Sequence, residues 1–406
     1  MLPPLRILKT TLRRTTEMLA HQLAKPREDT PDWNELEWRT AMAVAAAHGI
    51  SPLLCTLPRW DDLAWSQFLV DQRAHVEHRC GRIFALLERI DAAACAEGVA
   101  VVPLKGSALH APGLYLPGDR PMADIDLLVH ERDAEKVGGL LQALGYAESF
   151  AQWKHRVFKP LEGSPPAVLG EHRDTPINIE LHTHIQERLP MHTVDITDRI
   201  YPSEPQPGLN PYPSTAALLS HLLLHAAGNI CNRTLRLIHL NDIALLAMRV
   251  PPSEWEALWG THASNDTPWW ALPPLTLTAR YYGDAVLAKL RDPLETQCPA
   301  LLRTISHHQT LTQVSCSELW LHAFAGVEWS RSLGEAKSYV TNRVRPSKET
   351  MQERSDMVRT QLWLRDQPWV TQSRGRRMLR WLTSGAPRMD TLYVVRAALA
   401  YPAALE

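Results

Sequence analysis

Three carboxylates near the middle of the sequence have the spacing of a metal-binding site. Asp124 and Asp126 lie one residue apart in DIDLLV, and Glu180 lies in INIELHTH. Side chains two positions apart on a strand project from the same face. Carboxylate oxygens are hard ligands that suit Mg²⁺, and like charges that converge without a cation repel one another. The pattern predicts that Asp124, Asp126 and Glu180 hold a divalent metal ion.

A second chemical feature, Lys105-Gly106-Ser107, follows the apolar run VAVVPL. A helix that starts there would present backbone N–H groups and the positive end of its dipole to phosphate. Glycine lets the chain approach phosphates closely, the Ser107 hydroxyl can donate a hydrogen bond, and Lys105 adds a point charge. Arg120, in the connector PGDRP, is a further cation that could steer a triphosphate. We therefore predict nucleotide binding by these four residues.

A small sheet is needed to bring these residues together. VAVVPL and DIDLLV are short, apolar and β-branched, which predicts buried strands, and AEKVGGLLQALG predicts a helix after the second one. INIELHTH alternates, so we expect Glu180 and His182 on its polar face and isoleucines on the other. Glu180 would then lie beside the two aspartates.

Helices surround this region in the sequence. Apolar spacing predicts helices that end at Gly49 and Gly98, and a Ser-capped helix is expected at STAALLSHLLLHAAGN, followed by RLIHLNDIALLAMR. The expected fold class is α+β, with a small mixed sheet between two helical parts. We predict three parts: residues 1–98 (helical), 99–200 (core) and 201–406 (helical).

Several polar residues have more than one interpretation. His221 and His225 have the i, i+4 spacing of a zinc-binding helix, but Leu222 occupies the position where zincins carry glutamate. A polar edge that lines the nucleotide pocket is an alternative, and it would include His182, His225, Arg236 and Asp242. For His182 a structural or substrate-facing role is favoured over metal ligation.

Composition limits the class of protein. The formal net charge is -1, and the six cysteines include no Cys-x-x-Cys pair. We find no secretory h-region and no apolar run of the roughly 18 residues that a membrane span needs, so we expect a cytoplasmic protein without membrane contact. Arg374, Arg376, Arg377 and Arg380 surround Trp381. A solvated helix face is favoured there over an RNA-binding surface.

The order of these motifs resembles the DNA polymerase beta-like nucleotidyltransferase superfamily. Within it, LKGSALH…GLYLPGDRPMADIDLLV…LGY, IELHTH and HLLLHAAGN…RLIHLNDIALL are similar to the family of uncharacterised nucleotidyltransferases. The resemblance implies a palm-type sheet and transfer of an NMP from an NTP to a hydroxyl, with release of pyrophosphate. One departure is that Glu180 stands where many superfamily members have Asp.

The resemblance also implies roles for the site residues. Asp124 and Asp126 would bind two Mg²⁺ ions, Glu180 would bind the one that activates the acceptor, and Gly106 and Ser107 would hold the β- and γ-phosphates. The acceptor stays open: a protein, peptide or small molecule is favoured over RNA because the chain lacks a net basic charge. The alternative function is a catalytically silent nucleotide-binding module that regulates or recruits a partner.

Overall fold

The computed structural model describes most of the chain. It covers residues 3–400 apart from 59, 152–153, 164–167, 256–257, 259–267, 284, 317–325 and 345–390. The arginine cluster around Trp381 lies outside the described residues. Within them, no helix has both the length and the apolar character to cross a membrane.

A six-stranded mixed sheet forms the centre of the fold. Its strand order is β3-β4-β5-β2-β1-β8. Two neighbouring pairs, β2 with β5 and β1 with β8, are parallel, and the others are antiparallel. The strands are β1 (Ala100–Pro103), β2 (Asp124–Val129), β3 (Tyr146–Ala151), β4 (His155–Pro160), β5 (Asn178–His182) and β8 (Gly208–Leu209). This mixed sheet among helices confirms the predicted α+β class.

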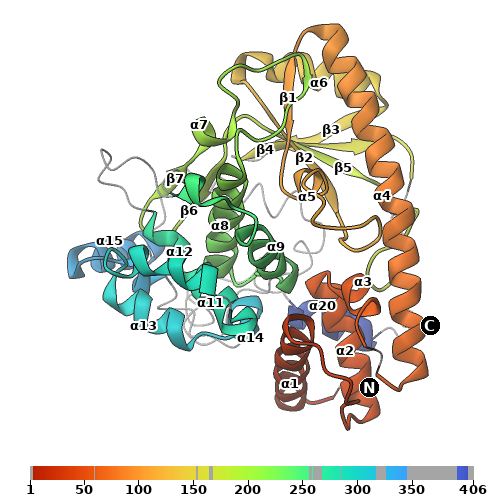
Figure 1. Cartoon of the computed structure of the whole chain (residues 1–406), viewed down its shortest axis with the longest axis vertical. Coiled ribbons are helices and arrows are strands. Elements are labelled where there is room, and N and C mark those ends of the chain that lie inside the picture. Colours follow the sequence, from red (N-terminus) through yellow and green to blue (C-terminus); the bar gives the residue numbers. More distant parts are fainter. Residues whose placement is uncertain are drawn as a thin grey trace.

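One face of the sheet packs on α4 (Leu63–Glu97) and α6 (Ala134–Ala143) (Figure 1). Ile125, Leu127 and Val129 of β2 join Ile179 and Leu181 of β5 in this buried cluster. Each such side chain stabilises the fold by roughly 1.5–3 kcal/mol when it leaves water. The predicted alternation of both strands is confirmed, and it turns their polar residues to the opposite face.

The opposite face meets three helices, α5 (Gly106–Leu109), α8 (Thr215–Asn232) and α9 (Leu237–Ala247). Leu128 of β2 belongs to the apolar cluster on this side, together with the leucines of α8 and α9. Ser214 caps α8 as predicted, because its side chain accepts a hydrogen bond of 3.1 Å from the Ala217 N–H. These helices enclose the polar residues of β2 and β5.

The remaining helices form one apolar core with α8 and α9. As predicted, α2 and α4 end at left-handed glycines, Gly49 with φ 68° and Gly98 with φ 66°. Helix α20 packs against α1 and α2 (Figure 1), so the first and last helices share this core. The division at residues 98 and 200 stays a prediction about separately folding parts.

The other elements lie outside the central sheet. They are α1 (Leu5–Ala24), α2 (Glu35–His48), α3 (Ser51–Cys55), β6 (Gln186–Arg188), β7 (Thr193–Asp195), α7 (Thr197–Ile200), α11 (Leu272–Tyr282), α12 (Ala285–Glu295), α13 (Ala300–His308), α14 (Leu311–Ser315), α15 (Leu333–Val344) and α20 (Thr391–Ala400). Strands β6 and β7 pair with each other in a separate two-stranded sheet.

Candidate active site

The three predicted acids lie together on neighbouring parallel strands. In the register of β2 and β5, Asp126 is beside Glu180 and Asp124 is beside Asn178. His182 connects two of the acids: its Nε2 is 3.0 Å from Asp126 Oδ1 and 3.7 Å from Glu180 Oε2. We call Asp124, Asp126 and Glu180 the acid cluster.

Arg79 of α4 fixes the strand ends that carry the acid cluster. Its guanidinium is almost fully buried, with 1% of the side chain exposed. It donates hydrogen bonds to the carbonyls of Met122 and Ala123, just before β2, and to those of Thr175 and Pro176, just before β5. One side chain therefore holds both strands at their starts. Sequence reasoning missed this residue.

Lys105 neutralises one acid instead of standing free for phosphate. Its Nζ is 2.8 Å from Asp126 Oδ1. Its backbone has φ 47° and ψ -115°, a conformation that costs a non-glycine residue on the order of 1–3 kcal/mol. The Tyr212 hydroxyl accepts the Lys105 N–H at 3.3 Å and lies 2.8 Å from His221 Nδ1. Lys105 thus lies between the Gly-Ser turn and Asp126, and its role toward phosphate stays a prediction.

Negative charge exceeds positive charge at the acid cluster. Burial, together with Asp126 and Glu180, raises the pKa of Asp124 to about 7. For Asp126, burial opposes ionisation, but Lys105 and the hydrogen bond from His182 outweigh it and hold the pKa well below its ordinary value. Although burial opposes its charge, hydrogen bonds to Asp126 and Glu180 raise the pKa of His182. The cluster would bind an additional cation readily.

The Gly-Ser turn is present, although its helix is a single turn, Gly106–Leu109. The Ser107 N–H donates to the Leu104 carbonyl at 3.2 Å, so that donor is not free for phosphate, in contrast to the prediction. Ser107 is only 9% exposed, and its Oγ is buried with no hydrogen-bond partner among the described residues. A buried hydroxyl of this kind is usually hydrogen-bonded, so the Ser107 Oγ is available to a ligand such as phosphate.

Arg120 and Asp242 differ most from their predicted roles. Asp242 accepts hydrogen bonds from Arg120 Nε at 2.8 Å and Nη2 at 2.7 Å, and from the Tyr115 hydroxyl at 2.7 Å. Both charged side chains are buried. Arg120 Nη1 also fills the space beside Gly106, where a Cβ would lie 2.5 Å from it. The pair supports the turn from behind, so neither residue is a free ligand for a triphosphate.

Arg236, at the start of α9, is closer to its predicted role. Its guanidinium makes no hydrogen bond or ion pair with any described residue, and its Nε is buried. Burial lowers its pKa, and its charge acts on Asp124 and Glu171. An unpaired, half-buried cation near the acid cluster is suited to an anionic ligand.

Further polar residues that sequence reasoning missed surround the cluster. His155 on β4 is directly opposite His182 in the strand register, and its Nδ1 is 3.4 Å from Glu180 Oε2. Burial lowers the pKa of His155 to about 4. His225 faces Glu187, which also pairs with Lys154, and it has no third metal ligand among the described residues. The zinc interpretation of the α8 histidines therefore gains no support.

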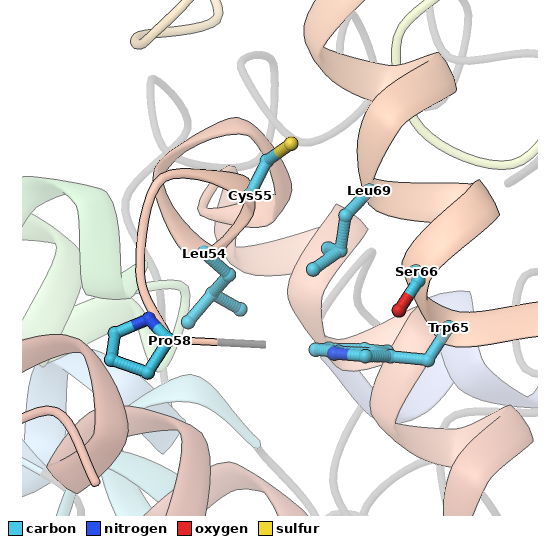
Figure 2. A pocket seen from close by; sticks show the side chains of 6 residues that line it. All are labelled: Leu54, Cys55, Pro58, Trp65, Ser66 and Leu69. Carbon is cyan, nitrogen blue, oxygen red and sulfur yellow. The ribbon is translucent and has the colours of Figure 1, made fainter. Parts of the chain in front are cut away.

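A small pocket away from the acid cluster is lined by no charged side chain. It lies between α3 and the first turns of α4, with a largely apolar lining (Figure 2). Trp65 precedes Arg79 by 14 positions on one helix, which places the pocket roughly 20 Å along α4 from Arg79. Its lining consists of Leu54, Cys55, Pro58, Trp65, Ser66 and Leu69. Without a carboxylate, imidazole or lysine, it is not the catalytic site.

Comparison with known proteins gives the same class as the sheet and its acids. Residues 34–282, more than half of the chain, match the family described as "Uncharacterised nucleotidyltransferase". The chain belongs to this family, and it is a nucleotidyltransferase in the general sense of an enzyme that transfers a nucleotidyl group. No curated protein and no solved structure matched the chain.

Proposed function

We propose that the enzyme is Mg²⁺-dependent and transfers an NMP from an NTP to an acceptor hydroxyl, with release of pyrophosphate. The observation that carries this proposal is the acid cluster, because three carboxylates share one face of the sheet with a single lysine against them. Burial, followed by the charges of Asp126 and Glu180, raises the pKa of Asp124, and a bound cation would favour its ionised form. The residues therefore fit a hard divalent cation.

The chain's own residues divide the chemistry between them. Asp124 and Asp126 would hold Mg²⁺, with Glu180 on the acceptor side. When bound, Mg²⁺ would stabilise the charge that develops on the phosphate oxygens. Ser107 Oγ donates a hydrogen bond to a phosphate oxygen, and Arg236 contributes its unpaired charge.

Glu180 accepts the proton as the acceptor oxygen bonds to the α-phosphorus. The bond from that phosphorus to the bridging oxygen breaks at the same time, and pyrophosphate leaves. His182 and Arg79 keep Glu180 and Asp126 in place during this exchange.

The test uses NTPs labelled at the α-phosphate, each with Mg²⁺ and a lysate that supplies acceptors. The full-length protein should label an acceptor and release pyrophosphate. Asp124→Asn and Asp126→Asn should each lose at least about 10³-fold in rate, because each removes charge from the metal position. Asp198→Asn, an exposed residue on α7, is the matched control and should keep the full rate. Undiminished transfer by either acid variant contradicts the mechanism.

A nucleotide-binding module without turnover is the second candidate, and one observation favours it. Lys105 Nζ forms an ion pair with Asp126 at the position where a metal ion would bind. The lysine thus supplies a cation from the chain itself. Calorimetry would then show NTP binding by the wild type, with no pyrophosphate released for any acceptor.

A further inference from the structure

We propose that His155, Glu180 and His182 form a metal site for a first-row divalent ion such as Zn²⁺, next to the Mg²⁺ position at Asp124 and Asp126. It goes beyond the proposed function because it requires no transfer reaction. We call these three residues the imidazole site.

The backbone brings the imidazole site together. In the antiparallel pairing of β4 with β5, His155 is opposite His182, and Glu180 lies two residues before His182 on the same face of β5. The two imidazole rings are 5.0 Å apart between centroids, in an edge-to-face arrangement. Their positions are therefore set by strand pairing and not by flexible loops.

The distances suit one bound ion. The ligand atoms of the three residues lie within 4.8 Å of one another. Glu180 Oε2 is 3.4 Å from His155 Nδ1 and 3.7 Å from His182 Nε2. Two ligands that are each about 2.1 Å from a metal ion are separated by about 3.0–3.4 Å at octahedral or tetrahedral angles. The two distances from Glu180 are therefore within a few tenths of an ångström of those that coordination requires.

Burial and an unused nitrogen point to a ligand. The side chains of His155 and His182 are 11% and 7% exposed. His155 Nδ1 is buried and makes no hydrogen bond with any described residue, although Glu180 is near. Asp126 Oδ1, 3.0 Å from His182 Nε2, is placed to become a fourth ligand. An unsatisfied nitrogen in such a group is better explained by a metal than by packing.

The ligand types select the metal. Mg²⁺ prefers oxygen ligands and strict octahedral geometry, whereas imidazole nitrogen suits Zn²⁺ and other first-row ions. Two imidazoles and a carboxylate therefore favour Zn²⁺ over Mg²⁺. If the proposed transfer is correct, the acceptor side of the enzyme uses a different metal from the nucleotide side.

The experiment measures metal binding without any turnover. Chelator-treated, full-length protein is titrated with ZnSO₄, MnCl₂ or MgCl₂ alone, and bound metal is counted by elemental analysis. We expect one tightly bound Zn²⁺ per protein. His155→Gln should raise the Kd for Zn²⁺ by at least about tenfold. His308→Gln removes an exposed histidine on α13 and should leave the Kd unchanged. An equal Kd for the wild type and His155→Gln overturns the proposal.

Anomalous diffraction at the zinc edge locates the ion in the wild type, so the result does not depend on a variant that folds. A peak between the rings of His155 and His182 supports the site, and a peak between Asp124 and Asp126 alone overturns it. The two proposals fail separately: Zn²⁺ at the imidazole site without pyrophosphate release contradicts only the transfer reaction. Transfer with Mg²⁺ and no Zn²⁺ binding contradicts only the imidazole site.

Discussion

Arg120–Asp242 and Lys105–Asp126 are ion pairs of nearly equal length in opposite surroundings. Their N···O distances are 2.7 Å and 2.8 Å. Asp242 receives three hydrogen bonds from Arg120 and Tyr115, so its charge is satisfied. Asp126 shares its single lysine with two other carboxylates. The two ion pairs therefore differ in the charges around them and not in their length. The satisfied pair stabilises the fold, whereas the pair with excess carboxylates belongs to the candidate active site.

The first way to test this comparison is to remove one carboxylate from each pair. Asp242→Asn should lower the free energy of unfolding by about 3–5 kcal/mol, because Arg120 would remain buried without a counter-charge. Asp126→Asn should cost less, because Lys105 keeps Asp124 and Glu180 near it after the loss of its ion pair. Urea unfolding of both variants measures the difference, and equal losses would contradict the comparison.

A second prediction uses Mg²⁺ itself. Adding MgCl₂ to chelator-treated protein at about 100 times its Kd should stabilise the fold by about 2.7 kcal/mol, since the ion binds the folded state only. Mg²⁺ should stabilise the Asp126→Asn variant much less. The Asp242→Asn variant should still be stabilised by Mg²⁺, because its acid cluster is unchanged. Thermal unfolding with and without Mg²⁺ shows this, and an undiminished gain in Asp126→Asn would place the ion elsewhere.

A third prediction, with the smallest effect per measured step, concerns a buried histidine of the helical core. His48 Nδ1 accepts the Leu237 N–H at 3.0 Å, and burial, assisted by Arg236, lowers the pKa of His48 to about 3. Between about pH 6.5 and 3 the unfolded chain binds a proton that the folded chain does not. Stability should therefore fall as pH drops through this window, by up to about 1.4 kcal/mol per pH unit.

The check is to compare His48→Asn, whose side-chain oxygen can accept the same N–H, with the control His308→Asn. Other buried histidines have lowered pKa values too, so the variant should reduce the slope without abolishing it. Identical slopes for the two variants would show that His48 is not the group responsible.

Local patterns in the sequence predict the acids and the elements that carry them. The alternation in DIDLLV and INIELHTH, the helix-ending glycines and the Ser214 cap all depend on neighbouring residues. His155 could not be predicted because its role depends on β4 pairing with β5, which no local pattern encodes. The pairing of Arg120 could not be predicted for the same reason, since its partner Asp242 is 122 positions away.

The hydrogen bonds from Arg79 have a consequence for the geometry of the acid cluster. Because they hold the chain just before β2 and just before β5, a helix outside the sheet fixes the starts of the two strands that carry the acid cluster. The separation of the acids therefore depends on one buried side chain as well as on the pairing of β2 with β5.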